Sequence, residues 1–149
     1  MPEEFVMRGQ TASGETEVLN FSGYKPGHAY RMTQFVLYPG SGIGSGDSEL
    51  LGSVTAGKTA VAPTDPDFNN EGLIAVSSHN ANNNVAYGPF VDSVVNDTFL
   101  ITQNLILMVQ DVAGGSRPVN WQCRFESVKM NGSQEAATNY KQYLISDGS

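Results

Sequence analysis

The clearest chemical pattern in the sequence is the segment that begins at Gly52 and ends at Thr59, which reads GSVTAGKT. It matches the phosphate-binding loop G-x-x-x-x-G-K-[ST]. In that loop, backbone N–H groups and the lysine hold nucleotide phosphates at the start of a helix. Pro63 and Pro66 follow too closely for such a helix to form. We interpret residues 52–59 as an ordinary loop, and nucleotide binding through them as a remote alternative.

A second segment, residues 65–71, reads DPDFNNE and places side-chain oxygens at alternate positions, as a Ca²⁺-binding loop would. The EF-hand pattern fails, because no glutamate stands at the twelfth position and the glycine is misplaced. Proline between two aspartates is typical of a turn held by Asx bonds. We predict a structural loop here, and the sequence leaves a bound cation open.

The other candidates for catalysis are isolated from one another. His28 and His79 fall in expected loops or strand ends, and two ligands do not make a catalytic zinc site. No G-x-S-x-G elbow supports a serine nucleophile. Cys123, the single cysteine, is expected to be an inert core thiol. We therefore predict a protein that is not an enzyme, with no catalytic residue, no cofactor and no metal ligand.

Composition favours a β-protein and argues against two classes of partner. The 149 residues suggest a single domain over residues 1–149, and 15 % charged residues with 16 glycines are typical of a β-sandwich with many turns. A net charge of −7 argues against nucleic acid and against an anionic membrane as partners. The longest apolar run is also far short of a membrane span.

Eight short segments have the residue types and alternation of β-strands. They are residues 5–8, 15–21, 29–38, 48–55, 73–78, 93–95, 105–109 and 119–126. Turns are expected at residues 9–14 and 79–84, and a slip in the alternation between Met32 and Phe35 predicts a β-bulge. Residues 1–14 form a possible N-terminal arm or edge strand.

Residues 134–144 follow helical spacing and predict a short C-terminal helix. Together with the strands, this indicates an all-β fold: an antiparallel β-sandwich of jelly-roll type that ends in a helix.

The strongest strand signals lie between residues 99 and 128. Val119, Trp121, Cys123 and Phe125 alternate with polar residues and are expected to face the core. Residues 105–109, LILMV, are apolar on both faces, and we predict that they form an antiparallel hairpin with the strand from Val119. Their outer face needs a second cover, for which a neighbouring subunit and the terminal helix are the two candidates.

Several segments give the chain a family resemblance. They are YRMTQFVLYPGSG, DPDFNNEGLIAVSS, FLITQNLILMVQD with VNWQCRFESVKM, and AATNYKQYLIS, and they span most of residues 16–146. In these segments the chain resembles small capsid-associated virion proteins of marine tailed bacteriophages, such as those that infect cyanobacteria. The resemblance implies a cement or decoration protein, made in the host cytoplasm and placed on the capsid exterior. Its partners would be the major capsid protein and copies of itself, in a dimer or trimer.

We expect neighbours to contact apolar residues at Phe5, Ile106, Met108, Tyr140 and Tyr143. The alternative is a receptor- or carbohydrate-binding module of a phage tail or fibre. Such a module would expose Trp121 or several tyrosines in a groove, whereas the alternation buries Trp121. The sequence leaves open the oligomer symmetry and the choice between head and tail.

Overall fold

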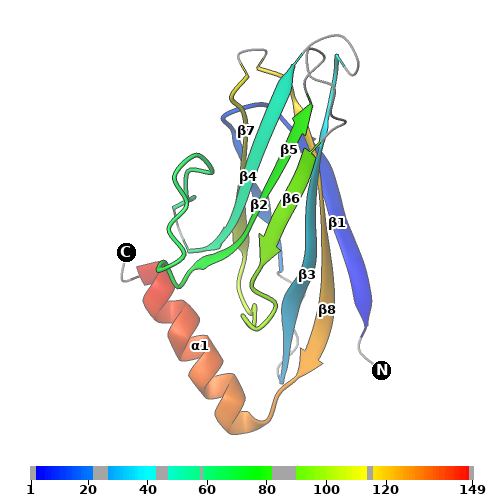
Figure 1. The fold of residues 1–149 in the computed structure, drawn as a ribbon. Helices are drawn as coiled ribbons and strands as arrows, with labels where there is room; N and C mark the ends of the chain where they lie inside the picture. Colours follow the sequence, from blue (N-terminus) through cyan, green and yellow to red (C-terminus); the bar gives the residue numbers. More distant parts are fainter. Residues whose placement is uncertain are drawn as a thin grey trace.

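The computed structural model describes residues 3–21, 27–42, 47–57, 59–81, 90–113 and 116–147. In this part of the chain, two antiparallel sheets stack face to face, and a helix follows the last strand (Figure 1). The elements are β1 (Glu4–Thr11), β2 (Thr16–Leu19), β3 (His28–Pro39), β4 (Ser48–Ala56), β5 (Leu73–Ala81), β6 (Phe90–Val95), β7 (Leu105–Asp111), β8 (Val119–Lys129) and α1 (Gly132–Asp147). The predicted all-β sandwich with a C-terminal helix is confirmed.

The smaller sheet has the order β1-β8-β3, with β8 at its centre. The predicted bulge in β3 is confirmed, because the register with β8 shifts between Met32 and Gln34. Residues 9–11, predicted as part of a turn, instead continue β1. The reason is close packing: a Cβ at residue 9 would lie 2.9 Å from Cζ2 of Trp121, so only glycine lets the strand pass this ring.

The larger sheet has the order β2-β7-β4-β5-β6. β5 runs on through residues 79–81, which the sequence predicts as a turn. His79 pairs with Leu50 of β4 and is buried, and its ring meets the Tyr38 ring edge-on with the centroids 5.4 Å apart. Burial between the sheets therefore extends the strand beyond the point where its residue types suggest a turn.

The predicted hairpin between residues 105–109 and the strand from Val119 is wrong. β7 pairs with β2 and β4, whereas β8 pairs with β1 and β3, so the chain crosses from one sheet to the other between them. The buried Asp111 carboxylate stabilises this crossing. It accepts hydrogen bonds from the backbone N–H groups of Ala113 (3.1 Å), Arg117 (3.1 Å) and, on β4, Glu49 (3.3 Å).

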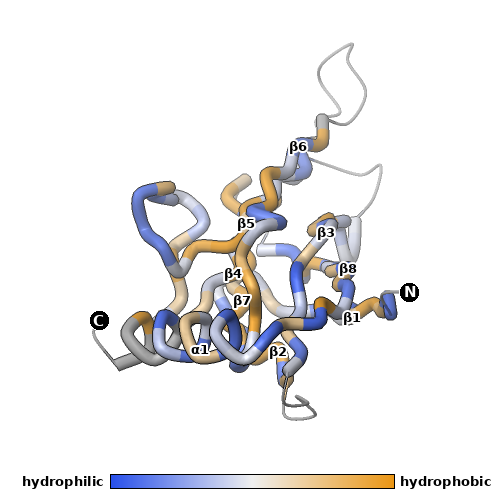
Figure 2. Tube along the Cα trace, turned by 90° about the horizontal axis from the view of Figure 1, so that it is seen from below, coloured by the Kyte–Doolittle hydropathy of each residue, from blue (hydrophilic) through white to orange (hydrophobic). Residues whose placement is uncertain are grey.

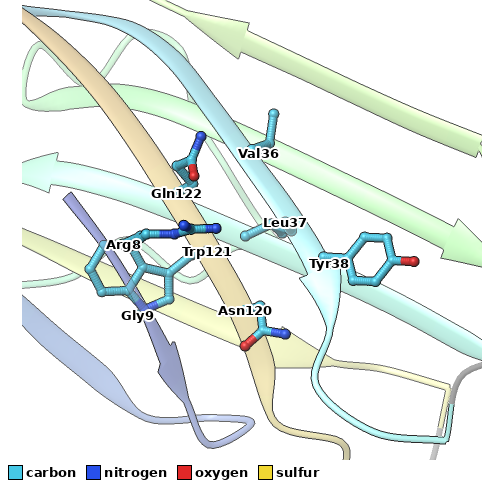
Figure 3. A pocket seen from close by; sticks show the side chains of 8 residues that line it. All are labelled: Arg8, Gly9, Val36, Leu37, Tyr38, Asn120, Trp121 and Gln122. Carbon is cyan, nitrogen blue, oxygen red and sulfur yellow. The ribbon is translucent and has the colours of Figure 1, made fainter. Parts of the chain in front are cut away.

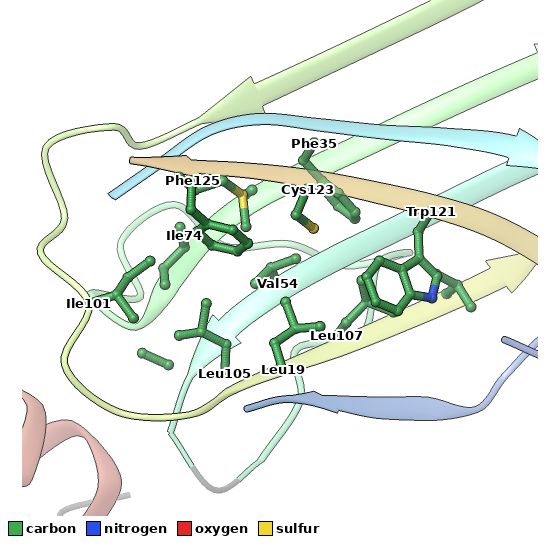
Figure 4. Packing of buried hydrophobic residues seen from close by; sticks show 14 of the residues in the cluster. Leu19, Phe35, Val54, Ile74, Ile101, Leu105, Leu107, Trp121, Cys123 and Phe125 are labelled. Atoms are coloured by element: carbon green, nitrogen blue, oxygen red, sulfur yellow. The ribbon is translucent and has the colours of Figure 1, made fainter. Parts of the chain in front are cut away.

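The core lies between the two sheets and draws residues from both (Figure 4). The predicted inward face of β8 is confirmed, because Val119, Trp121, Cys123 and Phe125 are all buried. The Trp121 indole N–H donates to Thr11 Oγ1 at 2.9 Å, which satisfies its polar atom inside the sandwich. Cys123 is fully buried, and burial raises the pKa of its thiol well above the usual range.

The C-terminal helix α1 extends the predicted residues 134–144 at both ends. Asn131 caps it, because its Oδ1 accepts the N–H of Gln134 at 2.7 Å. The helix lies at one end of the sandwich rather than over a sheet face (Figures 1 and 2). There Ile145 packs against the core, and Lys141 Nζ lies 5.5 Å from the centroid of the Phe99 ring.

Candidate docking site

The nucleotide-binding pattern of residues 52–59 does not form a phosphate loop. Residues 52–56 belong to β4, where Gly52 is paired with Ser77 of β5 and with Val109 of β7. Its backbone therefore belongs to the sheet ladder and cannot cradle a phosphate. Residues 59–72 then form a loop, and Ser53 Oγ donates to Val61 O at 2.5 Å beneath it. Lys58 lies outside the described residues.

The acidic loop at residues 65–71 uses its oxygens to turn the chain. Asp67 Oδ1 accepts the N–H of Asn69 at 2.9 Å, and Asn70 Oδ1 accepts the N–H of Gly72 at 2.9 Å. These are the Asx bonds expected of a structural loop. Across the described parts of the chain, no three His, Cys, Asp or Glu side chains come together in a group that could hold a metal ion.

The two histidines lie at opposite ends of the sandwich. His28 opens β3 and pairs with Lys129, whereas His79 contacts Tyr38 near the other end of the same strand. The structure therefore separates them, and they cannot share one site.

The predicted partner-contact residues lie in three separate places. Phe5 is half-buried and stacks on Phe125, with the ring centroids 5.4 Å apart. Ile106 and Met108 are half-buried on the outer face of β7. Tyr140 on α1 is 64 % exposed, and the side chain of Tyr143 lies outside the described residues. These residues do not form one continuous surface.

The outer face of the larger sheet is covered in a way that the sequence did not indicate. The loop of residues 59–72 runs over β4, and Ser53 and Thr55 are buried on that face. Beside it, Ile106 is paired with Thr55 on one side and with the exposed Val18 on the other. The second cover over β4 is thus a loop of the same chain, while Ile106 remains half-buried.

Further along the same face, exposed apolar residues of the loop and of β6 lie over β5 and β6. Phe68 is 66 % exposed, and Val94 of β6 is 49 % exposed. A hollow of about 220 Å³ is lined by Phe68, Leu73, Val76, Val94 and Val95. A second hollow of about 160 Å³ is lined by Pro63, Pro66, Val76 and Val94, together with polar residues that include Ser78 and Asp92. We call this surface, whose exposed or half-buried apolar residues are Pro66, Phe68, Val76 and Val94, the β5–β6 face.

The sequence contained one signal for the β5–β6 face that sequence analysis missed. Residues 94 and 95 are both valine, so β6 has apolar side chains on both of its faces, as residues 105–109 do. Phe68 carried no such signal, because it stands alone in a polar loop. Its place beside β5 depends on how the Asx turns fold that loop.

The smaller sheet carries a different surface, a groove of about 470 Å³ on β1, β8 and β3 (Figure 3). Its polar lining includes Arg8, Tyr38, Asn120 and Gln122. Asn120 is held by its neighbours, since its Oδ1 accepts from Gln10 Nε2 at 2.9 Å and its Nδ2 donates to Pro39 O at 3.3 Å. Trp121 also lines the groove, but it is only 9 % exposed, as predicted.

Comparison with known proteins assigns no family to the chain. No protein-family model and no curated protein matches it. Among solved structures, a chain of Desmodium yellow mottle tymovirus is similar, with a TM-score of 0.37 and 10 % sequence identity over 88 % of this chain and 90 % of that chain. A likeness of this extent carries no argument about function. The marine-phage resemblance stays a prediction. Among the described residues, no helix has the length and apolar character to cross a membrane.

Proposed function

We propose that this chain is a structural virion protein: a cement or decoration protein that binds the phage capsid through the β5–β6 face. The observation that carries the proposal is this apolar surface, with Phe68 and Val94 exposed, on a sandwich whose chemically suggestive segments are engaged in strands and turns. Contiguous exposed apolar surface of this kind marks protein–protein contact more often than catalysis.

Phe68 has the properties of a binding hot spot. The loop around it is held by the Asx bonds at Asp67 and Asn70, so little ordering entropy is lost when a partner covers the ring. A large aromatic side chain seated beside apolar hollows is the usual anchor of an interface. The exposed Asp65 and Asp67 flank it, and they suit a partner surface with basic side chains around an apolar pocket.

The partners in this proposal are the major capsid protein and further copies of the chain, at the capsid exterior. Support comes from the sequence resemblance to marine-phage virion proteins and from the net charge of −7, which keeps clustered copies soluble. Phe5, Ile106, Met108, Tyr140 and Tyr143 remain the proposed additional contacts. Of these, Tyr140 is the most readily reached by a neighbour.

Binding to capsid shells tests the proposal directly. Purified protein is mixed with undecorated shells of the source phage, and the bound fraction is measured after sedimentation. We expect Phe68→Ala to weaken binding about 100-fold, as loss of an aromatic anchor does. The matched control is Tyr38→Ala, which removes another exposed aromatic side chain, on the smaller sheet, and should bind as the wild type does. Wild-type protein that stays in the supernatant, or equal binding by both variants, would contradict the proposal.

The second candidate is a carbohydrate- or receptor-binding module, favoured by the groove on the smaller sheet. An exposed Tyr38 beside the fixed amide of Asn120 offers a stacking surface and directed hydrogen bonds to a sugar. Against it, Trp121 turns its indole to the core. Oligosaccharide titrations with wild-type protein and Tyr38→Ala distinguish the two functions, since saturable binding lost in this variant requires the groove.

A further inference from the structure

The two sheets have four edge strands, and three of them are protected against pairing with another chain. β1 carries the charged, exposed Glu4 and Arg8. β2 is four residues long and includes Glu17. β3 contains the bulge, and its residue Tyr30 exchanges backbone hydrogen bonds with Ile101 at 2.9 and 2.6 Å. Short length, charge, bulges and covering segments are the usual ways to block an edge.

The edge of β6 is less protected, because its six residues pair with β5 without a register shift and carry a single charged side chain, the exposed Asp92. Its sequence, FVDSVV, contains no lysine or proline, and Val91 and Val94 are 50 % and 49 % exposed on its two faces. Asn96 N–H donates to Ile74 O at 2.8 Å, and this bond shows which residues of β6 direct their backbone groups toward β5. By alternation, Asp92 and Val94 bond to β5, while Val91, Ser93 and Val95 direct their backbone N–H and C=O groups outward. No described segment pairs with these outward groups.

We propose that β6 of one copy pairs antiparallel with β6 of a second copy, about a two-fold axis at Ser93. The two five-stranded sheets then join into one continuous sheet. This dimer does not rest on the virion role, because it follows from the edge alone. Figure 2 shows β6 at the margin of its sheet.

The outward residues of β6 are self-complementary, which favours a second copy over an unrelated chain. With the axis at Ser93, each Val91 lies opposite Val95 of the other copy, and the two Ser93 residues lie opposite each other. On this face of the strand, valine meets valine and hydroxyl meets hydroxyl, as an isologous interface requires. On the other face, Asp92 of each copy lies opposite Val94 of the other, so the two carboxylates do not face each other. The outward groups of three residue pairs then form about six backbone hydrogen bonds.

Charge and bond count select this register over its neighbours. Moving the axis to Asp92 places the two Asp92 carboxylates opposite each other, and directly opposed like charges destabilise a sheet. Moving it to Val94 leaves Val91 beyond the end of the opposing strand and loses hydrogen bonds. In a protein of net charge −7, the β6 strand carries a single carboxylate, and this register keeps it off the axis, which limits repulsion between the two copies.

The first experiment removes one outward N–H. Ser93→Pro takes a donor from the free edge without touching a bond to β5, and edge strands tolerate proline at such a position. In sedimentation velocity at tens of micromolar, we expect wild-type dimers and dimerisation weakened about 30-fold in the variant. The matched control is Val6→Pro on β1. The Ser127 N–H donates to Glu3 O, so by alternation residues 5 and 7 bond to β8 and the N–H of Val6 points outward from the sheet. This variant should remain dimeric.

A cross-linking variant tests the register without depending on proline. Ser93→Cys places two thiols across the axis, at a Cα separation of about 5.5 Å that suits a disulfide. Mild oxidation should give a covalent dimer, whereas the control Val6→Cys should not. The native Cys123 does not compete, because it is fully buried.

Three results would overturn the dimer: a monomeric wild type, a Ser93→Pro variant as dimeric as the wild type, or no cross-link in Ser93→Cys. A monomer that binds shells and loses that binding in Ser93→Pro would instead assign the β6 edge to a segment of a capsid protein.

Discussion

The outer faces of the two sheets differ in how their side chains are satisfied. On the smaller sheet, long polar side chains pair with one another. Arg31 donates a hydrogen bond to Glu126 and Gln10 donates one to Asn120. Arg124 Nη1 also lies 3.9 Å from Glu4 Oε2. On the larger sheet, the β5–β6 face exposes valine, proline and phenylalanine, and β6 leaves its edge open.

The polar side chains of the smaller sheet are already satisfied by one another and by water. The exposed apolar side chains of the larger sheet would instead lower the free energy of the molecule if a partner covered them. Charged and amide pairs across strands keep the smaller sheet hydrated and discourage further strands. Exposed apolar area on the larger sheet gains about 25 cal/mol per Å² when a partner removes it from water. The molecule is therefore two-sided, and the larger sheet is the side we expect to find at interfaces.

The largest effect should come from removing the Asp111 carboxylate, which stabilises the segment where the chain crosses from the larger sheet to the smaller one. Asp111→Ala leaves the N–H groups of Glu49, Ala113 and Arg117 without their acceptor, so we expect a loss of about 3 kcal/mol in the free energy of unfolding. Asp111→Asn keeps one acceptor oxygen and should lose about 1 kcal/mol. Urea denaturation measures both, and equal losses would show that the acceptor oxygens are not what stabilises the crossing.

The next largest loss of stability should come from overpacking the smaller sheet. Gly9→Ala forces a methyl group against the Trp121 ring, and such overpacking should cost about 2 kcal/mol. The control is Gly132→Ala at the start of α1, where a Cβ meets no atom within 4 Å and stability should be unchanged or slightly higher. Tryptophan emission should shift in the first variant alone. Unaltered stability in Gly9→Ala would mean that β1 moves aside at little cost.

The sequence predicted which faces point inward better than it predicted which strands are neighbours. Alternation alone placed Val119, Trp121, Cys123 and Phe125 in the core, because a pleated strand has no other way to bury one side. Strand pairing depends on distant contacts, such as the hydrogen bond from the Glu49 N–H to Asp111, that no local pattern encodes. Hence β7 and β8, adjacent in sequence and strongly apolar, were wrongly predicted to pair.

The candidate site was harder to predict than the fold for a related reason. Ile106 and Met108 were predicted from a run that is apolar on both faces, and they do lie on an outer face. The β5–β6 face instead combines a lone phenylalanine in a polar loop with valines of a short strand. Only the loop's turns at Asp67 and Asn70 place Phe68 beside Val94. An apolar surface assembled from a loop and a strand has no period to detect.

The smallest effect on stability should come from the paired charges of the smaller sheet. Removing them tests whether these pairs keep the outer face of that sheet from associating. Arg31 and Glu126 lie on neighbouring strands, with Arg31 Nε 2.7 Å from Glu126 Oε1. Because the arginine is partly solvated, the coupling in a double-mutant cycle of Arg31→Ala and Glu126→Ala should be only about 0.5 kcal/mol and should shrink with added salt. The same single variants should leave the protein equally soluble and its oligomeric state unchanged, since each removes a charge from a face that lies outside both the β5–β6 face and the β6 edge. New association through the smaller sheet in Arg31→Ala would show that these pairs are what keeps that sheet from binding, and that the contrast between the two faces depends on a single ion pair.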